Sequence, residues 1–216
     1  MMKISRKRRI RQYYAARVCP DREGYEILSW SSREAQEQRF QVLLEILREN
    51  FAEGSCPTLL DVGCGLAELA VFLKNANCPV CYTGVDLTEA VLQEGQRRYP
   101  GLDLRMLDVF AESCPFPEQS FDVVFASGIF NMELGNNETF AVSGMLRLAA
   151  LAKYLAVANF LHKRNEFQHS LCHYYDPNFL LARLQQAALP VELQEDYLDN
   201  DFTLVFKRQR QGGIAP

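Results

Sequence analysis

The chain has 216 residues, of which 48% are apolar and 23% charged, and its formal net charge is −4. This length and composition are typical of one globular domain with a substantial core. No apolar run approaches the roughly 20 residues of a membrane-spanning helix, and the N-terminus lacks the apolar segment of a secretory signal. The seven cysteines form an odd, irregular set, which favours reduced thiols in a cytoplasmic protein. Cys78 and Cys81 form a C-x-x-C pattern without a second such pair, so we expect no metal site.

Residues 1–30 form a basic N-terminal arm. Every charged side chain before Asp21 is positive, and these are Lys3, Arg6, Lys7, Arg8, Arg9, Arg11 and Arg17. The favoured interpretation is a solvated, partly disordered terminus. Two alternatives remain open: binding of nucleic acid through residues 3–17, and an organelle-targeting segment.

Ser31 and Glu34 have the spacing of a capping box and predict a helix that runs to about residue 51. Its apolar stripe consists of Phe40, Leu43, Leu47 and Phe51. Gln36 and Arg39 fall on this stripe or at its edge, where polar groups need partners. Arg39 therefore extends its charged end to solvent or pairs with a buried acid, or else Gln36 and Arg39 both face a ligand.

Strands and helices alternate through the rest of the chain. We expect strands at 58–61, 80–86, 102–107, 121–126, 154–159, 191–197 and 202–207, with helices at 67–75, 88–99, 138–150 and 177–189. Asp199-Asn200-Asp201 is a strong turn signal between the last two strands. The pattern predicts one α/β domain over residues 31–208 whose sheet ends in a hairpin, followed by a polar tail at 209–216.

A glycine turn follows the first predicted strand, in the segment Asp61-Val62-Gly63-Cys64-Gly65-Leu66-Ala67-Glu68. Small residues at alternate positions let a ligand approach the backbone N–H groups of a helix N-terminus. Asp86 ends the next strand. Two acids at neighbouring strand ends suit a ligand with an ammonium group and a ribose, as in S-adenosyl-L-methionine (SAM). A dinucleotide would need a small residue where Glu68 stands, and Asp61 would repel its pyrophosphate.

This turn resembles motif I (D-x-G-x-G-x-G) of the class I SAM-dependent methyltransferases, with Ala67 in place of the last glycine. The resemblance covers residues 59–131 and implies a Rossmann-like three-layer sandwich. Its seven-stranded sheet would be mostly parallel, with an antiparallel last strand.

The resemblance also implies a cofactor site at the carboxyl ends of the strands. Asp61 would hold the methionine ammonium, Asp86 the ribose hydroxyls and Asp108 the adenine amino group. The residues expected to bind the cofactor are Arg39, Asp61, Gly63, Cys64, Gly65, Asp86, Leu87, Asp108, Val109 and Ser127.

All three histidines lie in one window after the fifth predicted strand, where an active-site lid is expected: His162, His169 and His173. Tyr174 and Tyr175 follow them. Methyl transfer needs an aligned nucleophile and sometimes a base, but no covalent residue of the protein. We therefore predict that His173 or Tyr174 acts in catalysis, by binding or deprotonating the acceptor.

The sequence predicts an enzyme that transfers a methyl group from SAM and releases S-adenosyl-L-homocysteine. It has no N-P-P-Y tetrapeptide and no Pro-Cys pair, which favours a small-molecule acceptor over DNA or protein. One alternative is an RNA or protein methyltransferase recruited by the basic arm. A second is a SAM-binding protein without catalytic activity, and Glu68 disfavours a nicotinamide oxidoreductase.

Overall fold

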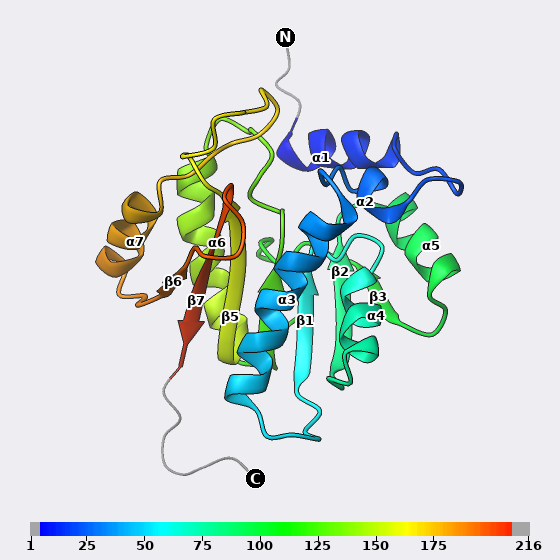
Figure 1. Ribbon diagram of the computed structural model, residues 1–216, viewed down its shortest axis with the longest axis horizontal. Coiled ribbons are helices and arrows are strands. Elements are labelled where there is room, and N and C mark those ends of the chain that lie inside the picture. The colour runs from blue at the N-terminus through cyan, green and yellow to red at the C-terminus, as the bar shows by residue number, and fades with distance from the viewer. Residues whose placement is uncertain (1–4, 209–216) are drawn as a thin grey trace.

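The computed structural model describes residues 5–208 and contains one seven-stranded sheet (Figure 1). The strands are β1 Thr58–Val62, β2 Cys81–Asp86, β3 Asp103–Met106, β4 Phe121–Ala126, β5 Ala152–Leu161, β6 Glu192–Gln194 and β7 Asp201–Lys207. Their order across the sheet is β3-β2-β1-β4-β5-β7-β6. Strand β7 is antiparallel to both of its neighbours, and the other neighbouring pairs are parallel. This topology confirms the predicted sheet.

Helices cover both faces of the sheet. The helices that follow the N-terminal arm are α3 Arg33–Asn50, α4 Glu68–Asn75, α5 Glu89–Arg98, α6 Asn137–Leu151 and α7 Pro177–Gln186. Leu59 of β1 packs in the apolar cluster of α3 and α4, whereas the next residue, Leu60, packs in the cluster of α6 and α7. Successive side chains of a strand point to opposite faces, so two apolar layers form around one sheet. None of the helices within residues 5–208 combines the length and apolarity that crossing a bilayer requires.

Some element boundaries differ from the sequence predictions. Helix α3 begins one residue later than expected, because Ser32 rather than Ser31 caps it: its Oγ accepts a hydrogen bond from the Ala35 N–H at 3.1 Å. Strand β5 is longer than predicted because it pairs with both β4 and β7. Strand β6 is shorter than predicted, and its three paired residues contact β7 at the edge of the sheet.

The expectation of a partly disordered N-terminal arm is wrong for residues 5–28. They form helix α1 Arg6–Ala15 and the short helix α2 Gly24–Ile27. Tyr14 packs against a buried cluster of Ile27, Leu66 and Val91, so an apolar side of the basic helix is anchored to the domain. Figure 1 shows α1 above the carboxyl end of the sheet. Residues 1–4, with Lys3, and the tail at 209–216 lie outside the described residues.

Candidate functional site

A cavity of about 1050 Å³ lies at the carboxyl ends of the parallel strands, beneath α1. Its walls include every residue that the sequence assigned to cofactor binding: Arg39, Asp61, Gly63, Cys64, Gly65, Asp86, Leu87, Asp108, Val109 and Ser127. These residues come from α3 and from four strand ends that neighbour one another in the sheet. The structure thus brings together groups that are spread over much of the sequence.

The turn after β1 is held in a conformation that requires glycine. Gly63 has φ +75°, and a Cβ built there would lie 2.2 Å from the Ile129 Cγ2. The Gly63 N–H donates to the Val85 carbonyl at 2.8 Å, which ties the turn to β2. Ala67 caps α4 with φ 64°, in the left-handed region where a small residue carries less strain. The turn therefore presents backbone rather than side chains to the cavity.

Asp61 is buried at the end of β1, where the Tyr82 hydroxyl donates a hydrogen bond to its Oδ2 at 2.6 Å. Burial raises the pKa of Asp61 to about 7, against the opposing effect of that hydrogen bond, and nearby Asp86 adds to the rise. Because burial disfavours the charged form of this carboxyl group, a cationic partner would stabilise its carboxylate form. This property suits a ligand ammonium group.

Asp86 has a partner at each carboxylate oxygen. Its Oδ1 accepts from the Thr88 N–H at 2.8 Å, and its Oδ2 accepts from the Gly65 N–H at 3.2 Å. Burial raises its pKa, while these backbone hydrogen bonds lower it. The carboxylate therefore holds the turn that leads into α5, whose N-cap is Thr88. Because each oxygen can accept more than one hydrogen bond, it can also accept from a ribose.

Helix α1 completes the far end of the cavity, which the sequence interpretation missed. The Lys7 Nζ lies 2.6 Å from the Asp108 Oδ2, and the Arg11 Nε donates to the Leu87 carbonyl at 2.9 Å. The guanidinium of Arg6 lies over the Phe140 ring, and burial lowers its pKa to about 10. The available signal was the spacing of Ile10, Tyr13 and Tyr14, which places apolar bodies on one side of a basic helix.

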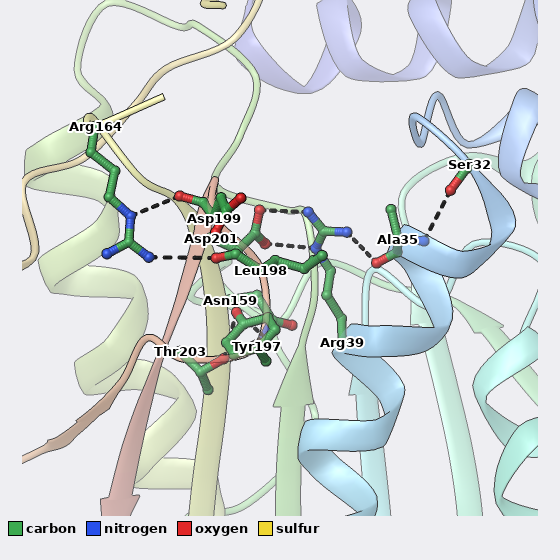
Figure 2. A network of polar contacts seen from close by, with 10 residues as sticks. All are labelled: Ser32, Ala35, Arg39, Asn159, Arg164, Tyr197, Leu198, Asp199, Asp201 and Thr203. Carbon is green, nitrogen blue, oxygen red and sulfur yellow. Dashed lines mark hydrogen bonds and ion pairs between the residues drawn. The ribbon is translucent and has the colours of Figure 1, made fainter. Parts of the chain in front are cut away.

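Arg39 forms a buried ion pair with Asp201 at the start of β7 (Figure 2). Its Nε lies 2.7 Å from Asp201 Oδ2 and its terminal nitrogen 2.5 Å from Oδ1, while its other terminal nitrogen donates to the Ala35 carbonyl. This geometry supports the buried-acid alternative. Arg39 also borders the cavity, so its contact with a cofactor stays a prediction. Gln36, its neighbour on the helix, donates to Glu68 at 2.9 Å.

The wall at the end of β4 contains unpaired polar atoms. Within residues 5–208, the buried Ser127 Oγ and Asn131 Oδ1 have no hydrogen-bond partner. Both residues line the cavity beside Trp30, the single tryptophan of the chain. Gly128 makes room for that indole, because a Cβ at this position would lie 2.7 Å from its ring. Buried polar atoms without partners favour a polar ligand in this space.

The histidines and tyrosines of residues 162–175 differ in where they lie relative to the cavity. Tyr174 lines the cavity, and its hydroxyl oxygen accepts from the His169 N–H at 2.9 Å. His173 is not among the lining residues. Its Nδ1 lies 2.8 Å from the Glu133 Oε2, and its backbone N–H donates to the Asn131 carbonyl. His162 contacts a glutamate through its other ring nitrogen, with its Nε2 2.9 Å from the Glu195 Oε1. The prediction for His173 therefore rests on the sequence alone.

Comparison with protein families gives one match over the first part of the sheet. Residues 59–149 match the family profile described as "Methyltransferase domain". This range includes both acidic strand ends, Asp61 and Asp86, and the end of β4.

Two curated relatives match a shorter stretch. Phthiotriol/phenolphthiotriol dimycocerosates methyltransferase 1 of Mycobacterium ulcerans is 44% identical over 68 residues, which are 31% of this chain and 24% of that protein. Demethylmenaquinone methyltransferase of Chlorobaculum parvum is 38% identical over 79 residues, 36% of this chain and 31% of that protein. The match thus spans about a quarter to a third of these relatives' lengths.

Among solved structures, the magnesium protoporphyrin IX methyltransferase of Synechocystis PCC 6803 with bound SAM has a TM-score of 0.65. The similarity covers 97% of this chain and 100% of that one, at 16% sequence identity. At this identity the likeness concerns the fold alone.

Proposed function

We propose that this chain, which has the class I SAM-dependent methyltransferase fold and a methyltransferase domain over residues 59–149, transfers a methyl group from SAM to a small-molecule acceptor. The observation that carries the proposal is the cavity itself. It gathers two acids at neighbouring strand ends, a turn with glycines at positions 63 and 65, and unpaired polar atoms at the end of β4. This set fits an ammonium group, a ribose and a third polar contact.

The chain's own residues would hold and orient the reactants. When bound, SAM supplies a methyl group activated by a sulfonium centre. Asp61 would hold the amino-acid end, and Asp86 would accept from the ribose hydroxyls. Tyr174 and Asn131 border the space that remains for an acceptor, where they would fix its position. Residues of helix α1 and Trp30 line the cavity. Their apolar groups would keep water from the reacting groups.

A small acceptor suits the size of the site. Residues of α1 and of the segment from Asn165 to Tyr174 line a cavity of about 1050 Å³, which is in the range of small-molecule sites. The partial relatives, by their names, act on small molecules. We also propose the cytoplasm as the compartment, since all seven cysteines are free thiols in this structure.

Ligand-dependent stabilisation tests the proposal directly. We expect SAM or S-adenosylhomocysteine at 100 times Kd to raise the free energy of unfolding by about 2.7 kcal/mol, with a matching rise in Tm. NAD and NADP serve as controls in the same thermal-shift series. Stabilisation by either dinucleotide and by neither SAM species would contradict the proposal.

Cofactor binding is expected to release a proton from Asp61. Its folded-state pKa of about 7 lies above the ordinary value of 3.8, so burial favours the protonated form and stability falls as pH rises between these values. An ammonium group bound beside Asp61 would instead favour the ionised carboxylate. At pH 6, calorimetric titration with S-adenosylhomocysteine should release about one proton, seen as a dependence of the binding enthalpy on the buffer. Asp61→Asn should abolish this dependence, and an equal dependence in both proteins would exclude Asp61 as its source.

Tyr174 is expected to contribute to turnover more than to cofactor binding. Removal of its hydroxyl in Tyr174→Phe keeps the ring and should lower turnover by roughly 100-fold if the phenol moves a proton. An acceptor is first found by screening phenols, amines and carboxylates for release of S-adenosylhomocysteine. His173→Ala provides the comparison, because that side chain does not line the cavity. Wild-type turnover in Tyr174→Phe would remove the hydroxyl from the mechanism.

The role of α1 as a wall of the cavity can be distinguished from a role in recruiting RNA. Lys7 and Arg11 contact the cavity wall, whereas Arg8 and Arg9 are exposed. Deletion of residues 1–17 should therefore weaken S-adenosylhomocysteine binding by at least about tenfold, as expected for loss of a wall of apolar and polar contacts. The double variant Arg8→Ala/Arg9→Ala should bind it normally. Salt-dependent RNA binding that is lost in both variants, with cofactor affinity intact, would favour the RNA alternative.

A further inference from the structure

Two exposed cysteines lie side by side at the end of the sheet opposite the cavity. Cys56 precedes β1 by two residues, and Cys81 is the first residue of β2. Their Sγ atoms are 3.1 Å apart. The Cys81 N–H donates to the Pro57 carbonyl at 2.9 Å, so the two backbone segments are hydrogen-bonded to each other at this point.

The partner of Cys81 in the structure is Cys56 and not Cys78, the other cysteine of the C-x-x-C pattern. Cys78 is partly buried against the apolar cluster of α3 and α4, whereas the sulfur of Cys81 contacts Cys56. Within residues 5–208, no group of three His, Cys, Asp or Glu side chains is arranged to hold a metal ion. Two thiols without a third ligand are suited to redox chemistry rather than to a structural metal site.

We propose that Cys56 and Cys81 form a reversible disulfide when the protein meets a low-molecular-weight disulfide such as oxidised glutathione. An S–S bond is about 2.05 Å long, so the sulfurs must approach by about 1 Å. Residues 51–57 connect α3 to β1 without helix or strand structure, and Cys56 can supply this movement. Both thiols are open to solvent, so the reagent can reach either sulfur.

The exchange proceeds in two balanced steps. The Cys81 thiolate attacks one sulfur of oxidised glutathione, which forms a mixed disulfide and releases one glutathione as its thiol. The Cys56 thiolate then attacks the Cys81 sulfur, which forms the protein disulfide and releases the second glutathione. Two protein thiols are oxidised and one glutathione disulfide is reduced to two thiols. The exchange balances in the same way if Cys56 attacks first, since both thiols are exposed.

The bond would join positions 25 residues apart in sequence. It would close a loop that contains β1, the glycine turn and α4, and it would restrict the unfolded chain more than the folded one. We therefore expect oxidation to raise Tm. Cofactor affinity should not change, because the pair lies at the amino ends of the strands and the cavity at their carboxyl ends.

The test uses the full-length protein equilibrated with defined ratios of reduced to oxidised glutathione. We expect the loss of two titratable thiols, a mass lower by two hydrogen atoms, a linked peptide that contains Cys56 and Cys81, and a Tm higher by several degrees. Dithiothreitol should reverse all four changes. Cys78→Ser is the matched control and should behave as the wild type.

Two variants make the outcome decisive. Cys56→Ser should stop at a mixed disulfide of Cys81 with glutathione, without a rise in Tm. Cys81→Ser should likewise stop at a mixed disulfide of Cys56 with glutathione, without a rise in Tm. The proposal is overturned if wild-type protein acquires two separate glutathione adducts, if Cys81 links to Cys78, or if both thiols stay reduced at oxidising ratios. These readouts need no bound cofactor and are independent of the proposed methyl transfer.

Discussion

Replacement of Arg39 by methionine is expected to lower the free energy of unfolding by about 3–5 kcal/mol. The two partners are almost inaccessible to solvent, at 3% exposure for the Arg39 side chain and 0% for Asp201. Methionine keeps an unbranched apolar chain but leaves the Asp201 carboxylate buried without its counter-ion. Urea denaturation monitored by circular dichroism measures the change.

The pH dependence of that deficit follows from Asp201. Burial already raises its pKa, and Arg39 opposes the rise. Without Arg39 the folded-state pKa goes up further, so the deficit is fully present above this new pKa. It should shrink as pH falls from there to the folded-state pKa of the wild-type carboxyl, which is itself raised above the ordinary 3.8. The double variant Arg39→Met/Asp201→Leu should recover most of the lost stability, because it replaces the ion pair by apolar groups. A deficit that is the same at all pH values would point to lost packing instead.

The same variant separates the structural role of Arg39 from a cofactor contact. S-adenosylhomocysteine has a carboxylate and adenosine has none. If Arg39 meets that carboxylate, Arg39→Met should weaken S-adenosylhomocysteine binding more than adenosine binding. Equal effects on both ligands would leave Arg39 as the partner of Asp201 that Figure 2 shows.

Loss of the Asp86 side chain is the second large expected effect. Asp86→Ala should cost about 1.5–3 kcal/mol of cofactor binding, or roughly 10- to 150-fold in Kd, because an ionised acceptor for two ribose hydroxyls is removed. Since Asp86 also accepts from the Thr88 and Gly65 N–H groups, we expect about 1 kcal/mol of lost folding stability as well. Isothermal titration with S-adenosylhomocysteine and thermal unfolding measure the two effects.

Asp86→Asn is the matched control. The amide keeps an oxygen that can accept from Thr88 and removes the charge, so it should retain more folding stability than alanine and still bind the cofactor weakly. An unchanged Kd in Asp86→Ala, with a lowered Tm, would assign Asp86 to the start of α5 alone.

Local sequence patterns determined the sheet and the acids at its edge. Alternating short apolar runs and helical stripes placed the strands. Asp61 is the last but one residue of β1, and Asp86 is the last residue of β2. Parallel strands of a sheet share one carboxyl edge, so these positions had to meet once the strand order was right. The glycine turn was predicted separately, from the spacing of its small residues after the first strand.

The tertiary structure alone decided the roles of groups whose partners are remote in sequence. Arg39 and Asp201 are 162 residues apart, and Lys7 meets Asp108 across most of the first half of the chain. Helical periodicity showed that Arg39 needed a partner but not which one. The many basic residues at 6–15 suggested a solvated arm, although Tyr14 of α1 packs against a buried apolar cluster. Cys81 likewise contacts Cys56 instead of its neighbour in the C-x-x-C pattern. Periodicity records only which side of an element is buried, whereas the identity of each partner depends on how the elements pack around the sheet.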